Sequence, residues 1–535
     1  MELREFIGRH VATIETLEKE MNLAYWDAAI SGTGEDFKRY SELQLRLEKV
    51  YTSKEDFAFV KRIKKSGKLQ DDHLARMVDL LYLRYLGNQI DSTLLQRIVD
   101  LSTKVENKFN IFRAKYDGKE ISTNEIYEIL RKENDSEKRR KIWEANKRVG
   151  PIVLTDMMEL VTLRNEAARQ LGFDNYYTMS LTLAEQSEDE LVRIFAELEE
   201  LTRKPFLKLK GELDESLSKR YGIRPQQIRP WHYHDPYFQE APQTDKIDLD
   251  LFYRGKDPVE IAKHFYDSIG MTVDDILARS DLYEKEGKNP HAFCTDMDRK
   301  GDVRILANMK DNNYWMETIL HELGHGVYDK YIDPSLPYIL RTYPHICMTE
   351  ASAMYFSRFS HDPAWMRAAL GLDEDKAQKI APKIQEFLRL KQLIFARWCQ
   401  TMYHFERGMY KNPNQDLNKL WWDIVERFQF VKRPEGRNEP DWATKIHIVS
   451  SPVYYHNYML GELIASQLHH YVKTKVLDGT EREVSICSNR SVGRYFLEVV
   501  YKPGDTLPWD KHVERITGEP LTARYFVEQF VEERN

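Results

Sequence analysis

Apolar residues recur every three or four positions over most of the chain, the spacing that gathers them on one face of an α-helix. The first thirty residues show this spacing in a stripe of Ile7, Val11, Ile14, Leu17 and Met21. It continues through short polar breaks to about residue 150. It predicts further helices at residues 154–171, 187–201, 257–270, 379–407, 417–430 and 455–468.

Only residues 289–294 and 303–309 have the composition of strands, and both come shortly before residue 313. The segment 224–242 is rich in proline and aromatic residues and predicts a long packed loop. Its two histidines, His232 and His234, are interpreted as structural, because a pair of histidines in a loop without further partners is more often structural than metal-binding. The pattern therefore predicts a mainly α protein with a few short strands.

Composition narrows the class of protein. A net charge of −7 over 535 residues, with no dense basic patch, does not indicate a nucleic-acid partner. No window reaches the eighteen apolar residues of a membrane span, and the charged first residues do not resemble a signal peptide. Four cysteines without C-x-x-C spacing make no disulfide framework. We therefore expect a cytoplasmic protein without a membrane partner.

One stretch carries a specific chemical signal, His321-Glu322-Leu-Gly-His325. Two histidines four residues apart on a helix project from one face and can bind one divalent metal ion. The glutamate between them can act as general base toward water activated by that ion. Asp311, Asn312 and Asn313 are candidate N-caps for the helix.

A zinc site of this kind needs a third protein ligand. A further histidine ten residues after His321 is excluded because Tyr331 stands there. Glu350 lies in an otherwise apolar helical pattern, where an unpaired carboxylate is costly, so it is the candidate third ligand. The alternative is an ion pair with an arginine such as Arg358. Two imidazoles and a carboxylate favour zinc over cobalt or manganese.

A second polar cluster follows at Lys445, His447, Tyr455 and Tyr458. We expect Tyr455 and Tyr458 to share a face of one helix, because they are three residues apart. An acyl-transfer site needs donors for an oxyanion and an anchor for the substrate terminus, and these side chains could supply both. The alternative is a pair of core tyrosines with satisfied hydroxyls.

The combined motifs resemble the angiotensin-converting-enzyme-like peptidyl-dipeptidases. The resemblance covers roughly residues 160–520 and rests on the metal helix with Glu350, and on four weaker motifs: Arg164-Asn165-Glu166, His291-Ala292, Leu420-Trp421-Trp422 and Ile516-Thr-Gly-Glu-Pro520. The run from Lys445 to Tyr458 completes it.

This resemblance implies one catalytic unit over residues 1–535, a two-lobed helical ellipsoid with a deep substrate channel. Residues 1–150 would form an N-terminal lid, and residues 151–535 the zinc-binding and channel region. It implies one zinc ion per chain, held by His321, His325 and Glu350, with Glu322 as general base and then acid.

The resemblance also assigns roles in binding the substrate. His291 and His447 would bind the substrate backbone, and the strand at Ala292 would pair with it by β-augmentation. Tyr458 would donate to the oxyanion. Lys445 and Tyr455 would hold the C-terminal carboxylate.

Some positions depart from the family pattern. Val425 and Asn457 stand where the family has its chloride-binding arginines, so we expect activity that needs no chloride. The gap between Ser451 and Tyr455 is one residue longer than the pattern, which leaves Tyr454 as a competitor for the role of Tyr455. The glutamine that completes the family's carboxylate pocket has no evident counterpart.

The predicted function is zinc-dependent hydrolysis of short peptides with release of C-terminal dipeptides. Two alternatives stay open within the enzyme class, a carboxypeptidase of the thermostable-carboxypeptidase type and an oligoendopeptidase of the thimet-oligopeptidase type. A peptide-binding module with a degenerate site is the alternative outside it. The sequence does not determine the physiological peptide or the oligomeric state.

Overall fold

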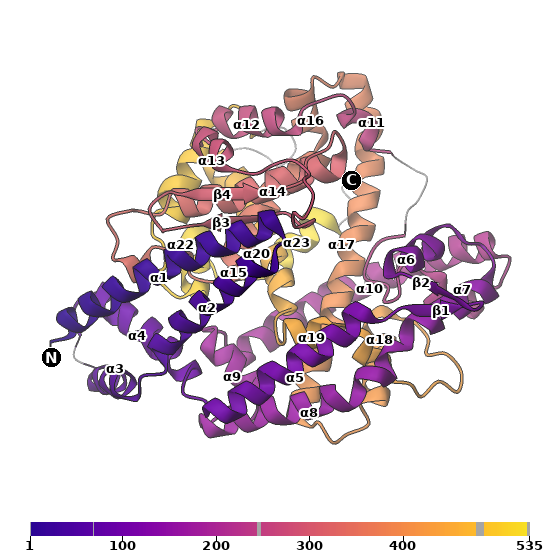
Figure 1. Cartoon of the computed structure of the whole chain (residues 1–535). Coiled ribbons are helices and arrows are strands. Elements are labelled where there is room, and N and C mark those ends of the chain that lie inside the picture. The colour runs from indigo at the N-terminus through magenta and orange to yellow at the C-terminus, as the bar shows by residue number, and fades with distance from the viewer. Residues whose placement is uncertain (1, 68, 243–247, 478–485, 532–535) are drawn as a thin grey trace. The chain divides into compact units, whose positions relative to one another are not determined.

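The computed structural model describes residues 2–67, 69–242, 248–477 and 486–531. Helices dominate it, with two small two-stranded antiparallel sheets among the described residues, as the sequence pattern predicted (Figure 1). The chain divides into two compact units, each built from segments that are distant in sequence. The first unit comprises residues 1–89, 247–384 and 460–521, and the second unit comprises the remainder.

The first unit begins with four helices and then carries the metal-binding motif. Its elements are α1 (Leu3–Ser31), α2 (Gly34–Tyr51), α3 (Lys54–Ser66), α4 (Asp72–Gly87), α11 (Asp250–Tyr253), α12 (Pro258–Ser268), α13 (Asp274–Arg279), β3 (Phe293–Asp296), β4 (Val303–Leu306), α14 (Asn313–Lys330), α15 (Ile346–Ser357), α16 (Pro363–Leu370), α21 (Arg490–Tyr495) and α22 (Trp509–Thr517). The second unit holds α5 (Ser92–Ile111), β1 (Ala114–Tyr116), β2 (Lys119–Ile121), α6 (Thr123–Lys132), α7 (Ser136–Lys147), α8 (Val149–Gln170), α9 (Tyr176–Leu183), α10 (Glu188–Tyr221), α18 (Leu417–Gln429), α19 (His447–Ser450) and α23 (Arg524–Phe530). Two helices, α17 (Glu374–Lys411) and α20 (His456–Tyr471), run from one unit into the other.

Helix boundaries follow from local side-chain chemistry. Ser187 caps α10 by accepting a hydrogen bond from the backbone N–H of Glu190, at the position that the sequence predicted. Asp257 caps α12 with Pro258 at its first position, also as predicted. The hairpin β1–β2 was not predicted, although Asp117 and Gly118 in its turn, both with positive φ, are its usual signal.

The sheet β3–β4 lies against the metal-binding helix in the first unit. Its register pairs Phe293 with Leu306 and Asp296 with Val303. On one face, Leu306 belongs to an apolar cluster with Trp26 and Ala29 of α1. The sheet thus lies between α1 and α14, next to the motif (Figure 1).

The predicted loop 224–242 belongs to the second unit and contains two single helical turns at residues 225–227 and 230–232. His232 bonds to Ser136 and to the backbone N–H of Arg229, and His234 bonds to Arg220. Both histidines make structural contacts here, in line with the sequence interpretation.

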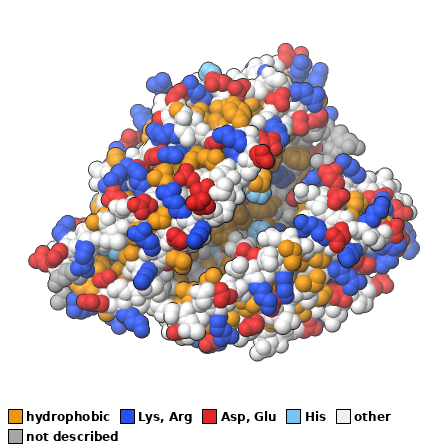
Figure 2. Space-filling model, viewed as in Figure 1, with side chains coloured by type: hydrophobic (Ala, Val, Ile, Leu, Met, Phe, Trp, Pro, Cys, Tyr) orange, Lys and Arg blue, Asp and Glu red, His pale blue; other side chains and the backbone are white. Residues whose placement is uncertain are grey.

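Charged side chains of both signs alternate over the visible face of the molecule, without a large area of one sign (Figure 2). This distribution agrees with the modest net charge of −7. The four cysteines, all within the described residues, form no disulfide. No helix in the described residues is long and apolar enough to cross a membrane.

Candidate metal centre and active site

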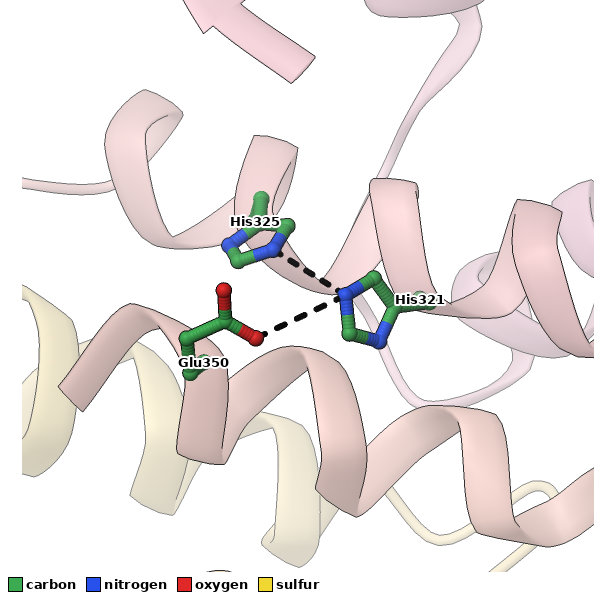
Figure 3. A group of neighbouring side chains, drawn as sticks. All are labelled: His321, His325 and Glu350. Atoms are coloured by element: carbon green, nitrogen blue, oxygen red, sulfur yellow. Dashed lines mark hydrogen bonds and ion pairs between the residues drawn. The ribbon is translucent and has the colours of Figure 1, made fainter. Parts of the chain in front are cut away.

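The HExxH motif lies in α14, which Asn312 caps by accepting from the backbone N–H of Trp315. The Nε2 atoms of His321 and His325 lie 3.2 Å apart, with the rings nearly perpendicular. Both rings leave the same face of α14 and point toward Glu350 (Figure 3). The helical spacing of the motif therefore produces the two-histidine arrangement that the sequence predicted.

Helix α15 brings Glu350 to the histidines. Its Oε2 atom lies 3.7 Å from Nε2 of His321, and one ligand atom from each of the three residues lies within 4.8 Å of the others. This is the only such group of possible metal ligands among the described residues. The alternative partner, Arg358, pairs with Glu462 instead.

The close packing of α14 on α15 depends on a glycine inside the motif. A Cβ atom at Gly324 would lie 2.6 Å from the Cα atom of Ala353, closer than real Cβ contacts. A second glycine, Gly461 of α20, packs in the same way, because its Cβ would lie 3.2 Å from Cβ of Glu350. Glycine at position 324 lets the backbones of α14 and α15 approach until the carboxylate of Glu350 meets the imidazoles.

The electrostatics of this group suit a divalent cation. Burial lowers the pKa of His321 to about 4, so its imidazole is neutral and offers a lone pair. Burial and then the charge of Glu462 raise the pKa of Glu350 to about 7. A buried carboxylate beside two neutral imidazoles lacks a positive partner, and zinc bound at these three atoms would supply it.

Thr349 supports the second histidine and was not identified from the sequence. Its Oγ1 atom lies 2.7 Å from Nδ1 of His325, while Nε2 of His325 faces Glu350. A hydrogen bond from Nδ1–H to the hydroxyl keeps the proton off Nε2, the atom that would bind metal. The signal available in the sequence was the position of Thr349 next to the candidate ligand Glu350, but a threonine in an apolar helix does not stand out.

Glu322 is buried and turned toward β3. Burial and then the charge of Glu350 raise the pKa of Glu322 to about 8, while the nearby backbone N–H of Cys294 works in the opposite direction. The strand therefore orients the predicted general base. His291 and Ala292 immediately precede this strand, the histidine exposed and the alanine half-buried.

The remaining predicted residues lie in the second unit and form a cluster of their own. Lys445 is buried, with its Nζ atom 5.4 Å from the ring centre of Tyr455. The rings of His447 and Tyr455 are 5.3 Å apart. The ring of Tyr458 lies 5.4 Å from Tyr455 and 5.2 Å from Tyr454.

The positions of these side chains correct the prediction that Tyr455 and Tyr458 share a helical face, and they show which groups lie beside Tyr455. Tyr455 precedes α20, which begins at His456, so Tyr455 and Tyr458 do not share a helical face. They meet because the chain turns just before the helix. The ring of Tyr455 contacts the ring of His447, and Tyr455 lies beside Lys445.

Gln239 is the residue of this cluster that sequence reasoning missed. Nζ of Lys445 donates to Oε1 of Gln239 at 2.7 Å. The burial of Lys445 lowers its pKa to about 8. Gln239 lies in the long loop at 224–242, far from Lys445 in sequence, and nothing in the local pattern pointed to it.

A mainly helical protein in which an HExxH helix meets a glutamate from the next helix has the architecture of a zinc metallopeptidase. The angiotensin-converting enzyme family model matches residues 1–531. The chain therefore belongs to this family of zinc peptidases, which act on peptides. No curated protein matches the sequence.

Proposed function

We propose that the protein is a peptidyl-dipeptidase that removes dipeptides from the free C-terminus of short peptides. The observation that supports this proposal is the buried group of Lys445, Gln239 and Tyr455. A lysine with a neutral amide and a phenol beside it is a suitable anchor for one carboxylate. In the family pattern, a glutamine completes the carboxylate pocket, and Gln239 is the candidate for it.

One zinc ion per chain, held by His321, His325 and Glu350, would act as a Lewis acid that acidifies water and polarises the scissile carbonyl. Glu322 accepts the proton of the attacking water and returns it to the leaving amine. The backbone N–H of Cys294, which lies near this carboxylate, would favour its charged form.

The second unit would provide the hydrogen bonds to the substrate. Tyr458 would donate to the oxyanion and His447 to the substrate backbone. His291 and Ala292 would bind the peptide from the first unit.

We propose further that the activity needs no added chloride. Asn457 accepts a hydrogen bond from Gln186 at 2.7 Å, so a neutral amide pair fills this position. Val425 lines a small cavity with Trp421 and Lys147. Burial lowers the pKa of Lys147 to about 7, so the lysine is partly neutral near pH 7. A cytoplasmic location, in keeping with the absence of disulfides, stays a prediction.

A time course on an unmodified decapeptide and on its C-terminally amidated twin tests the proposal, with products identified by mass spectrometry. Stepwise loss of dipeptides from the free acid alone is expected. Loss of single residues would indicate a carboxypeptidase, and internal cuts indifferent to amidation an oligoendopeptidase. A protein that binds zinc and peptides without cleavage would be a binding module.

The variant Lys445→Met tests the anchor itself. We expect the ratio of kcat/KM for the free acid to that for the amide to fall at least tenfold. Lys147→Met is the matched control, because Lys147 is also a buried lysine whose Nζ lies near aromatic rings and contacts a neutral partner, the hydroxyl of Thr444. An unchanged ratio in Lys445→Met would exclude its role as carboxylate anchor.

A further inference from the structure

The hydrogen-bonding pattern of β3 leaves one edge of the strand pointing away from β4. At the turn, the N–H of Met297 donates to Asp302 at 2.8 Å. In an antiparallel ladder, hydrogen-bonded pairs alternate with pairs that are not hydrogen-bonded. Phe293 lies four residues before Met297, so its N–H and C=O groups also point toward β4, where it pairs with Leu306. The residues on either side of it, Ala292 and Cys294, therefore direct their N–H and C=O groups outward.

Only part of this outer edge is used by the protein. The N–H of Cys294 faces the carboxylate of Glu322, and the carbonyl of Asp296 accepts from Nδ2 of Asn22 at 3.0 Å. Within the described chain, no hydrogen bond reaches the carbonyls of Ala292 or Cys294. The edge is thus capped at Asp296 and open directly beside Glu322, where a peptide main chain can add as a third strand.

Side chains of β3 alternate between two sides of the sheet. The Sγ atom of Cys294 faces α14, 3.6 Å from the position of a Cβ on Gly326. The ring of Phe293 faces α1 instead and lies 6.2 Å from the ring of Trp26. A peptide residue paired opposite Phe293 would place its own side chain on this α1 side of the sheet, because directly paired residues share a face.

An aromatic group stands on that side, formed by Phe293, Tyr25 and Tyr40. The ring centres of Phe293 and Tyr25 are 5.2 Å apart, as are those of Tyr25 and Tyr40. All three side chains are half-buried, so each keeps part of its surface accessible to solvent. Rings at these separations stack favourably, and a further ring or aliphatic chain placed against them would bury apolar surface.

The aromatic group is held in a fixed position next to the strand. The N–H of Asn289 donates to the carbonyl of Ala29 at 2.8 Å, which ties the segment before β3 to the end of α1. Gly32 has a φ of 66°, and a Cβ there would lie 2.2 Å from the carbonyl oxygen of Gly287. This backbone contact needs glycine, and it fixes the turn between α1, which carries Tyr25, and α2, which carries Tyr40.

We propose that the aromatic group is a specificity subsite, which takes an apolar and preferentially aromatic side chain of the substrate. The residue bound is the one that pairs opposite Phe293. It lies within two residues of the scissile bond, because Cys294, the next residue of β3, lies beside the general base Glu322. This proposal rests on the proposed peptidase function and adds a substrate preference to it.

The test is the cleavage profile of the zinc-loaded enzyme on a library of synthetic peptides that vary one position at a time on both sides of the bond. We expect the wild-type protein to prefer aromatic over alanine at one position within two residues of the bond. Tyr25→Ser and Tyr40→Ser should reduce that preference about tenfold and leave the other positions unchanged. Tyr25→Phe, which retains the ring, should keep it.

Tyr82→Ser is the matched control, because Tyr82 is also a half-buried tyrosine of the first unit and is stacked on Phe57, not on β3. Cleavage without an aromatic preference, or with a preference that Tyr25→Ser does not alter, would overturn the subsite and leave the peptidase function standing. Absence of any cleavage by the zinc-loaded wild-type protein would overturn the proposed function, and the subsite with it.

Discussion

Replacing Thr349 by valine removes the hydrogen bond to His325 and little else. The side chain is almost fully buried, and valine has nearly the same shape, so the packing of α15 is kept. The lost contact is the 2.7 Å hydrogen bond between Oγ1 and Nδ1 of His325. Without it the imidazole can rotate, and either nitrogen can carry the proton.

Outer hydrogen bonds to metal-binding histidines contribute roughly 10- to 100-fold in metal affinity. This corresponds to about 1.4–2.7 kcal/mol, and we expect the zinc Kd of Thr349→Val to rise by that factor. The measurement is a competition titration of zinc against a chromogenic chelator at fixed pH. Activity at saturating zinc should recover a substantial part of the wild-type value.

Ser352→Ala is the matched control. Ser352 is another buried hydroxyl on α15, and it donates to the carbonyl of Gly324 and bonds to Tyr501, so its loss affects the packing of the helices and no histidine directly. A zinc Kd for Thr349→Val within twofold of wild type, with an unchanged unfolding midpoint, would refute the argument that this hydroxyl orients the ligand.

Three further predictions follow from single residues. Glu322→Gln should retain stoichiometric zinc, measured by metal analysis, and its kcat should fall at least a thousandfold, measured by a peptide assay. Loss of zinc from the variant would contradict a role of Glu322 confined to proton transfer. Gly324→Val should weaken zinc binding and lower the unfolding midpoint, because the new Cβ would lie 2.6 Å from the Cα of Ala353. Gly8→Val is the control and should keep the zinc affinity, because a Cβ at Gly8 has no neighbouring atom within 4 Å. Burial lowers the pKa of His10 to about 4, so its contribution to stability is present above pH 6.5 and is lost as the pH falls from about 6.5 to about 4. Between pH 7 and pH 5, the wild-type protein should therefore lose about 2 kcal/mol more unfolding free energy than His10→Phe, as measured by urea denaturation. An unchanged pH dependence in the variant would show that His10 is not held neutral.

The helical character of the chain and the common face of His321 and His325 were predictable because both depend on local spacing. A period of 3.6 residues sorts apolar from polar positions within a single helix, and the interval between His321 and His325 fixes their common face. Caps such as Ser187 act within one turn, so their effect also appears in the local sequence.

Predictions failed where an element is very short or where a turn replaces regular structure. The strands β1 and β2 have three residues each, too few to show an alternating pattern. The spacing of Tyr455 and Tyr458 predicts a shared helical face, but the chain turns before His456 and brings the two rings together in another way.

The sequence by itself determined that the two candidate ligand histidines and the candidate general base lie on one helix, since their spacing is helical. Only the tertiary structure decided that Arg358 pairs with Glu462, that Thr349 supports His325, and that Gln239 meets Lys445. The reason is physical. A contact within one helix is set by its geometry, whereas a contact between segments up to 206 residues apart depends on which backbones pack together, and that is decided by the whole core.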